Sequence, residues 1–222
     1  MTQAQTIRHP ARYTPALLPV FAEYLQGAGF ILDPFAGTGE RLEDLQALLP
    51  GARIVGIELE PDWIKSPLVR QGNALDLPFD DRSFDAILTS PTYANRMADH
   101  HEARDDSPRN TYRHRLGRPL HPDNSGGLQW GREYRTFHLR AWTSALRVLK
   151  PGGVFVLNVK DHIRAGKRVR VTDWHIEALQ GLGCMVTDRA DIAAPGNRYG
   201  ANGGLRVESE AVIRFIYTGH YY

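Results

Sequence analysis

The stretch FILDPFAGTG, residues 30–39, decides the fold that we expect for this chain. Its apolar start predicts a short strand over residues 30–33, and a helix is expected over Glu40–Leu48. Gly37 and Gly39, between the two, allow a tight turn and a close approach of the backbone to a ligand. The helix that follows presents free N–H groups at its positive end. This pattern is typical of a nucleotide-type pocket at the end of a buried strand.

A carboxylate supports that interpretation. The next apolar run, Arg53–Glu58, predicts a second strand, and Glu58 closes it about 20 residues after the glycine turn. A carboxylate at this distance accepts hydrogen bonds from a ribose. Strand, helix and strand with short connections form a βαβ unit, so we expect the sheet to be parallel here.

A second turn is expected at the same edge of the sheet. The strand Phe84–Thr89 delivers Ser90, Pro91, Thr92 and Tyr93 to its carboxyl end. The carboxyl ends of parallel strands meet at one edge, so this turn should face the glycine turn.

The two turns, DPFAGTG at 33–39 and SPTY at 90–93, resemble the motifs of the S-adenosylmethionine (SAM)-dependent amino-methyltransferases of DNA, over about residues 8–160. The resemblance implies an α/β, Rossmann-like class I SAM methyltransferase fold, with a single doubly wound, mostly parallel sheet and an antiparallel C-terminal strand. Thr92 departs from the family, which usually has a second proline there. Threonine leaves the backbone N–H free and the turn less rigid.

The resemblance also implies which residues hold the cofactor. An H-P-A-x-F/Y-type segment folds over the methionine end of SAM, the glycine turn and its acidic partner hold the middle, and a G-D/N-A turn lies beside the adenine. The implied SAM-binding residues are His9, Pro10, Arg12, Tyr13, Asp33, Pro34, Phe35, Gly37, Gly39, Glu58, Asn73, Ala74 and Ser90.

The catalytic residues implied are Ser90, Pro91 and Tyr93. An exocyclic amine is a poor nucleophile because its lone pair is delocalised into the base. If Ser90 Oγ and the Pro91 carbonyl accept its two hydrogens, the lone pair turns towards the methyl group of SAM. Tyr93 would stack on the flipped base. Because of Ser90, the resemblance favours cytosine N4 over adenine N6 as the target, and no metal ion is needed.

Two stretches are predicted to contact nucleic acid. Residues 94–133 are expected to form a long loop insertion in which arginines alternate with aromatic residues, and residues 160–207 a basic, glycine-rich loop region. Acidic residues nearly balance the arginines of the first stretch, so a solvated lid stays an alternative. The predicted contacts are Arg96, Arg113, Arg115, Lys167, Arg168, Arg170, Arg198, Tyr199 and Arg206.

Composition sets the remaining expectations. With 222 residues, 42% hydrophobic and 23% charged, the chain suits one methyltransferase domain over residues 1–222. A single cysteine, Cys184, excludes an internal disulfide, and no run is long enough to cross a bilayer, so a cytoplasmic protein is expected. The expected partner is nucleic acid, with DNA favoured and a homodimer left open. The alternatives are an RNA base or a small molecule as the substrate, or a role for the chain as a weakly active SAM-binding partner subunit.

Further elements complete the expected fold. Helices are expected over residues 61–69, 134–149 and 172–182 and within 16–25, and strands over 154–159, 184–187 and 211–217.

Overall fold

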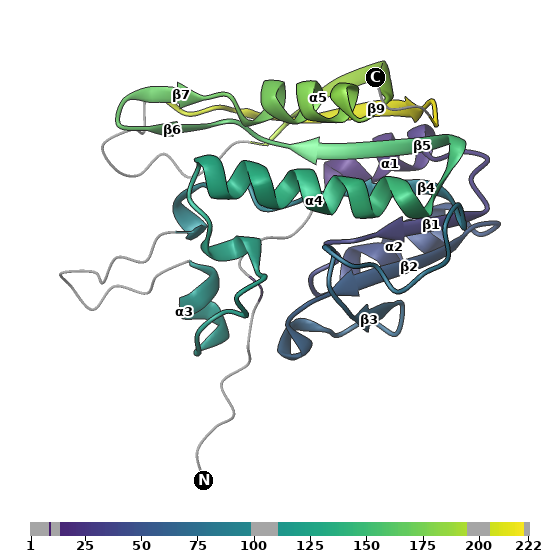
Figure 1. Ribbon diagram of the computed structural model, residues 1–222, viewed down its shortest axis with the longest axis horizontal. Coiled ribbons are helices and arrows are strands. Elements are labelled where there is room, and N and C mark those ends of the chain that lie inside the picture. Colours follow the sequence, from purple (N-terminus) through teal and green to yellow (C-terminus); the bar gives the residue numbers. More distant parts are fainter. Residues whose placement is uncertain (1–8, 10–13, 99–110, 195–204, 220–222) are drawn as a thin grey trace, which may run out of the picture.

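The computed structural model describes residues 9, 14–98, 111–194 and 205–219. Within them lies a seven-stranded sheet of order β3-β2-β1-β4-β5-β9-β8 (Figure 1). Strands β1 to β5 run parallel, whereas β9 is antiparallel to both β5 and β8. The predicted α/β class, with a mostly parallel sheet and an antiparallel C-terminal strand, is confirmed. The strands are β1 Phe30–Asp33, β2 Arg53–Glu58, β3 Val69–Gln71, β4 Phe84–Thr89, β5 Leu149–Val159, β8 Cys184–Ala193 and β9 Ser209–Tyr217.

Helices cover both faces of this sheet. In Figure 1 helix α4 runs along the front of the sheet, and α1 and α2 lie behind it. Strand residues alternate between the two layers: Leu32 and Ile87 belong to the core cluster shared with α4 and α5, whereas Ile31 and Leu88 belong to the cluster shared with α1 and α2. The helices are η1 Pro15–Leu17, α1 Leu18–Tyr24, α2 Glu40–Leu48, η2 Pro61–Trp63, η3 Arg96–Ala98, α3 Tyr112–Leu116, η4 Ser125–Gly127, α4 Arg132–Val148 and α5 Val171–Gly181.

The first βαβ unit has the bounds that the sequence predicts, from β1 through α2 to β2. Its turn requires glycine at position 39, where φ is 75°. A Cβ added to Gly39 would lie 2.3 Å from Val69 Cγ2 and 2.7 Å from Ser66 Cβ. A larger residue would therefore push β3 away from the turn.

The helix predicted over residues 61–69 is wrong. A single 3-10 turn, η2, is followed by irregular backbone and then by β3, which pairs with β2. Pro67 explains the error, because proline lacks an N–H and disfavours helical backbone at the residue before it.

The prediction of a structureless insertion over residues 94–133 is also wrong in part. Residues 99–110 lie outside the described residues, but η3, α3 and η4 lie on either side of them. Tyr112 and Leu116, one helical turn apart on α3, pack against Trp63. The second half of the insertion is therefore fixed to the body of the molecule.

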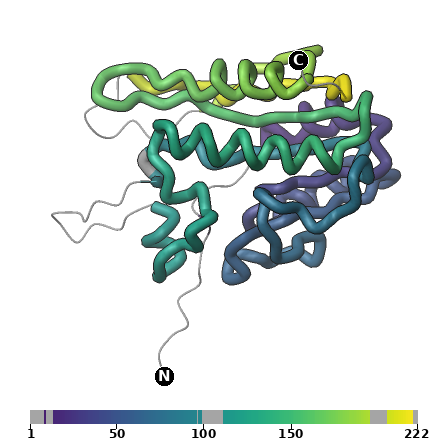
Figure 2. The backbone as a smooth tube through the Cα atoms, in the orientation of Figure 1, coloured from purple at the N-terminus to yellow at the C-terminus, as the bar shows by residue number. Residues whose placement is uncertain are grey.

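The expected basic and glycine-rich loop region over 160–207 needs a similar correction. An antiparallel hairpin joins β6, His162–Arg164, to β7, Lys167–Val169, through Ala165 and Gly166, which both have positive φ. It is followed by α5 and by β8, which extends six residues beyond the predicted strand. Figures 1 and 2 show the hairpin at the end of the molecule to which β5 points, the end where α3 also lies.

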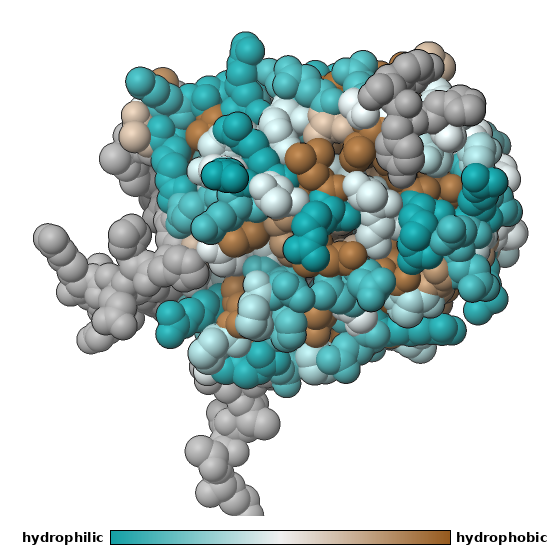
Figure 3. Space-filling model, in the orientation of Figure 1, coloured by the Kyte–Doolittle hydropathy of each residue, from teal (hydrophilic) through white to brown (hydrophobic). Residues whose placement is uncertain are grey.

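The surface is of mixed character. In Figure 3 the visible face carries mostly hydrophilic residues, with hydrophobic side chains in small groups between them. None of the described helices combines the length and apolar character that a membrane span needs. Among the described residues no group of three or more His, Cys, Asp or Glu side chains is placed to hold a metal ion.

Candidate functional site

A cavity of about 280 Å³ opens at the carboxyl edge of the sheet, where both predicted turns meet. The glycine turn forms one wall and the turn at residues 90–93 forms the other. The predicted residues that line it are His9, Pro34, Phe35, Gly37, Gly39, Glu58, Asn73, Ala74, Ser90, Pro91 and Tyr93. The structure therefore brings these predicted residues together around one cavity.

The glycine turn is held by two carboxylates. Asp33 is buried outside the cavity lining, and its Oδ1 accepts a hydrogen bond from Phe35 N at 2.9 Å. Glu58 Oε2 accepts from Gly37 N at 3.1 Å. His9 covers the turn, since a Cβ added to Gly37 would lie 3.4 Å from its imidazole ring. Asp33 thus shapes the turn from behind, whereas Glu58 and His9 reach the cavity.

Glu58 has an unusual electrostatic environment. Burial raises the pKa of its carboxyl to about 7, although backbone N–H groups of Glu60 and Gly37 oppose the rise. Glu60 N donates to Glu58 Oε1 at 2.8 Å. The group therefore changes charge close to neutral pH.

The predicted adenine-side turn is linked to the insertion. Asn73 Oδ1 accepts from Leu75 N at 2.9 Å, and Asn73 Nδ2 donates to Asp123 Oδ2 at 2.9 Å. Asp123 also lines the cavity, and nothing in the sequence pointed to it. Its position depends on how the insertion folds back.

In the second turn, Ser90 and Tyr93 hydrogen-bond to each other through their hydroxyl groups, 2.6 Å apart. Asn158 Nδ2, from β5, donates to Ser90 Oγ at 3.2 Å and to Tyr93 Oη at 3.0 Å. Burial, aided by the charge of Glu210, raises the pKa of Tyr93 well above its usual range, so the phenol stays protonated.

Thr92 takes a structural role that proline could not fill. Its Oγ1 donates to Ser125 of η4, at 2.9 Å from Ser125 Oγ and 3.2 Å from Ser125 O. A side-chain bond thus links the turn to the segment that covers the cavity.

The Thr92 carbonyl is fixed from the other side by a buried chain. Tyr134 Oη donates to it at 2.6 Å and lies 2.9 Å from His175 Nε2, while Trp142 Nε1 donates to His175 Nδ1 at 3.1 Å. Burial lowers the pKa of His175 well below its usual value. The neutral ring therefore accepts at Nδ1 and donates from Nε2 to Tyr134, which leaves the tyrosine proton for Thr92.

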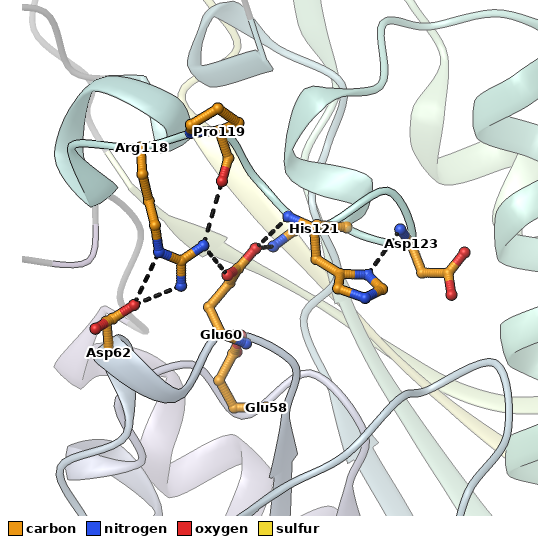
Figure 4. Close-up of polar contacts among 8 residues, drawn as sticks. Glu58, Glu60, Asp62, Arg118, Pro119, His121 and Asp123 are labelled. Atoms are coloured by element: carbon orange, nitrogen blue, oxygen red, sulfur yellow. Dashed lines mark hydrogen bonds and ion pairs between the residues drawn. The ribbon is translucent and has the colours of Figure 1, made fainter.

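The segment 118–124 is anchored to Glu60 and Asp62, which follow β2 (Figure 4). Glu60 is 1% exposed, and its Oε1 accepts from His121 N at 2.7 Å and from Asn124 Nδ2 at 3.0 Å. Its Oε2 pairs with Arg118 at 2.8 Å, and Arg118 also binds Asp62. A buried carboxylate thus holds this segment by three contacts.

Those predicted nucleic-acid contacts that the structure describes are not part of the cavity lining. Arg113 and Arg115 are exposed on α3, and Lys167 is exposed on β7. Arg168 pairs with buried Asp161 at 2.8 Å, and Arg170 pairs with Asp173 at 3.4 Å. These two pairs satisfy charges that we had expected to face phosphate. Arg206 is half-buried and does not line the cavity.

The remaining predicted site residues lie outside the described part of the chain. They are Pro10, Arg12, Tyr13, Arg198, Tyr199 and the side chain of Arg96.

Comparisons with known proteins agree with this geometry. Residues 32–107 match the family model of a methyltransferase domain. Demethylmenaquinone methyltransferases of Roseiflexus sp. (strain RS-1) and Roseiflexus castenholzii are 38% and 37% identical over 76 residues, 30% of this chain and 32% of each relative. The match thus spans about a third of these curated relatives.

Solved structures extend the similarity to the whole sheet. A SAM-dependent methyltransferase from Methanosarcina mazei has a TM-score of 0.56 at 15% identity, over 89% of this chain and 96% of that one. The 1,6-didemethyltoxoflavin-N1-methyltransferase of Burkholderia thailandensis, solved with S-adenosylhomocysteine, has a TM-score of 0.51 at 15% identity, over 92% and 77%. The fold is that of the Rossmann-like methyltransferases. At these identities the structural likeness concerns the methyltransferase fold alone.

Proposed function

We propose that this chain is a SAM-dependent methyltransferase that acts on the exocyclic amine of a nucleic-acid base, with DNA as the favoured polymer and cytosine N4 ahead of adenine N6. The observation that carries the proposal is that the glycine turn, Glu58 and the turn at residues 90–93 line one cavity. A methyl donor and an amine held in these two turns would meet in the same space.

The residues of the wall formed by the glycine turn suit SAM. The backbone at Gly37 and Gly39 has no side chain in the way, and Glu58 offers a carboxylate for ribose hydroxyls. Asn73 and Ala74 lie where the adenine is expected, and His9 covers the turn. When bound, SAM supplies an electrophilic methyl group on a positively charged sulfur.

The second wall suits the acceptor. Ser90 Oγ accepts a hydrogen bond from Asn158, and when its proton points to Tyr93 a lone pair remains for an amine hydrogen. Accepting amine hydrogens draws the nitrogen towards tetrahedral geometry and frees its lone pair for attack. The half-buried Tyr93 ring, held at its hydroxyl, offers a face on which a base can stack.

DNA as partner rests on the motif resemblance and on the exposed cations Arg113, Arg115 and Lys167. These lie on α3 and β7, which Figure 1 shows at the same end of the molecule, and α3 also contributes Tyr112 to the cavity lining. The pairing of Arg168 and Arg170 with aspartates reduces the charge available to phosphate.

A small-molecule acceptor is the second candidate. It is favoured by the curated relatives, which are demethylmenaquinone methyltransferases, and by the anchored segment 118–124, which adds Asp123 and Asn124 to the cavity lining.

Transfer of labelled methyl from SAM separates these candidates. Duplex DNA, single-stranded DNA and RNA are each incubated with the chain, and the nucleosides are identified after digestion. We expect label on cytosine N4 of DNA. Ser90→Ala should lower transfer by about 10- to 100-fold, as expected for a lost positioning contact, while SAM binding stays within about twofold.

Thr143→Ala, a change at an exposed α4 residue outside the cavity lining, serves as the matched control for the lost hydroxyl. SAM binding without label in any nucleic acid would refute the proposed substrate and favour the small-molecule candidate. Equal transfer by Ser90→Ala and wild type would refute the assignment of the turn at residues 90–93 as the acceptor site.

A further inference from the structure

One amide nitrogen gathers three oxygen atoms at the acceptor side of the cavity. Asn158 on β5 is 1% exposed, and its Nδ2 donates to Ser90 Oγ, to Tyr93 Oη and, at 3.0 Å, to Glu210 Oε2. An amide nitrogen carries two hydrogens. One is therefore directed at the Glu210 carboxylate, and the other is shared by the two hydroxyl groups.

The carboxylate fixes the orientation of this amide, because an amide oxygen turned towards Glu210 would face another acceptor. This orientation of the amide lowers the stability of the fold. Among the described residues Asn158 Oδ1 is buried without a hydrogen-bond partner. A buried polar atom left unsatisfied in this way calls for a reason beyond stability.

The sheet topology brings Glu210 to this place. Because β9 runs antiparallel to β5, its amino end reaches the edge where the parallel strands end, and Ala211 pairs with Val159. Glu210 is the second residue of β9 and lines the cavity. A residue 52 positions after Asn158 thus becomes its direct partner.

The carboxylates of the cavity lining divide between its two walls. Glu58 bonds to the glycine turn and Asp123 bonds to Asn73, both on the cofactor side. Glu40 lies at the start of α2, next to the glycine turn. Of the four described carboxylates that line the cavity, Glu210 is the one tied to Ser90 and Tyr93.

We propose that Glu210 binds the acceptor amine, which defines the acceptor as a group with N–H hydrogens. The inference rests on the proposed function. Ser90 Oγ and the Glu210 carboxylate present two acceptors, the complement of an –NH₂ group, and a carboxylate is the usual partner of the cytosine amine. A carbonyl at the same position would face the Glu210 carboxylate, which has no hydrogen to donate, and be disfavoured.

The carboxylate also has a role in the transfer step. With SAM bound, a new N–C bond would form as the C–S bond breaks with its electron pair left on sulfur, and the nitrogen would become positive. Glu210 would stabilise that charge and take the proton that the nitrogen then loses. A serine hydroxyl by itself offers no charge for this task.

The preference for cytosine over thymine in a binding experiment tests the inference without methyl transfer. The chain is saturated with S-adenosylhomocysteine, and binding of fluorescent single strands of about 12 nucleotides, oligo-dC and oligo-dT, is measured by anisotropy. Thymine carries a carbonyl where cytosine carries the amine. We expect wild type to prefer oligo-dC by about fivefold or more, and Glu210→Gln to bring this ratio close to one.

The ratio of the oligo-dC and oligo-dT affinities does not respond to net charge, because loss of a negative charge strengthens binding to both strands alike. The amide oxygen that Glu210→Gln introduces can still accept from Asn158, so a purely structural role would survive the substitution. Glu208→Gln, at an exposed residue of the same segment outside the cavity lining, is the matched control and should keep the wild-type ratio.

Methyl transfer gives a second measurement. With wild-type transfer to DNA established, Glu210→Gln should lower kcat by about 100-fold and leave S-adenosylhomocysteine affinity unchanged. An unchanged dC-to-dT ratio in an active Glu210→Gln enzyme would overturn this inference and leave the proposed function standing. Failure of wild type to bind either strand would overturn both.

Discussion

The pKa of Glu58 leads to a prediction about cofactor binding. Ribose hydroxyls donate hydrogen bonds, and an ionised carboxylate accepts them more strongly than a protonated one. With a pKa of about 7, Glu58 is ionised in about one-tenth of the molecules at pH 6 and in about nine-tenths at pH 8. Ligand binding that requires the ionised form should therefore strengthen about tenfold over this range, or about 1.4 kcal/mol.

Adenosine is the ligand for this experiment, because it contains the ribose and has no group that titrates between pH 6 and 8. Its affinity is measured calorimetrically at pH 6, 7 and 8, in buffers of different ionisation enthalpy. Binding should release close to half a proton at pH 7, where Glu58 is half ionised in the free chain.

Glu58→Gln is the control, since it keeps the shape of the side chain and has no proton to lose. It should bind adenosine more weakly at pH 8 and with the same affinity at pH 6 and pH 8. The reasoning is refuted if wild-type affinity is the same at pH 6 and 8, or if Glu58→Gln keeps the wild-type pH dependence. Either result would mean that the carboxylate does not bind the ribose or does not titrate in this range.

Two further predictions concern the segment over the cavity. Thr92→Val keeps the shape of the side chain and removes its bond to Ser125, so the free energy of unfolding should fall by about 1 kcal/mol in urea denaturation; equal stability would show that this bond contributes nothing in solution. Glu60→Ala removes the acceptor of the His121 amide, so the hydrogen exchange of this amide should speed up by about tenfold or more. Asp62→Asn weakens only the exposed ion pair of Arg118 and should leave the exchange rate of the His121 amide within about twofold of wild type. Equal exchange in the two variants would argue against Glu60 as the anchor.

The two walls of the cavity draw on different parts of the chain. Glu58, Asn73 and the glycine turn form their contacts within or next to the first βαβ unit, which falls within the segment that matches the methyltransferase family model. Ser90 and Tyr93 lie within the same segment, whereas Asn158 and Glu210, which extend their hydrogen-bond network, lie beyond residues 32–107.

The sequence by itself determined strands β1, β2 and β4 and helix α2. The bounds of β1, α2, β2 and β4 follow from short apolar runs, from Gly37 and Gly39, and from the helix start at Glu40. These signals are local, because each depends on residues a few positions apart. The prediction failed where a local signal was misread, as at Pro67, which prevents the helix expected over 61–69.

Tertiary structure decided the contacts that complete the site. Glu210 meets Asn158 because β9 enters the sheet antiparallel, between β5 and β8, and Thr92 meets Ser125 because the insertion folds back over the cavity. Such contacts depend on strand order and register. A one-residue slip of β9 would turn Glu210 to the other face of the sheet.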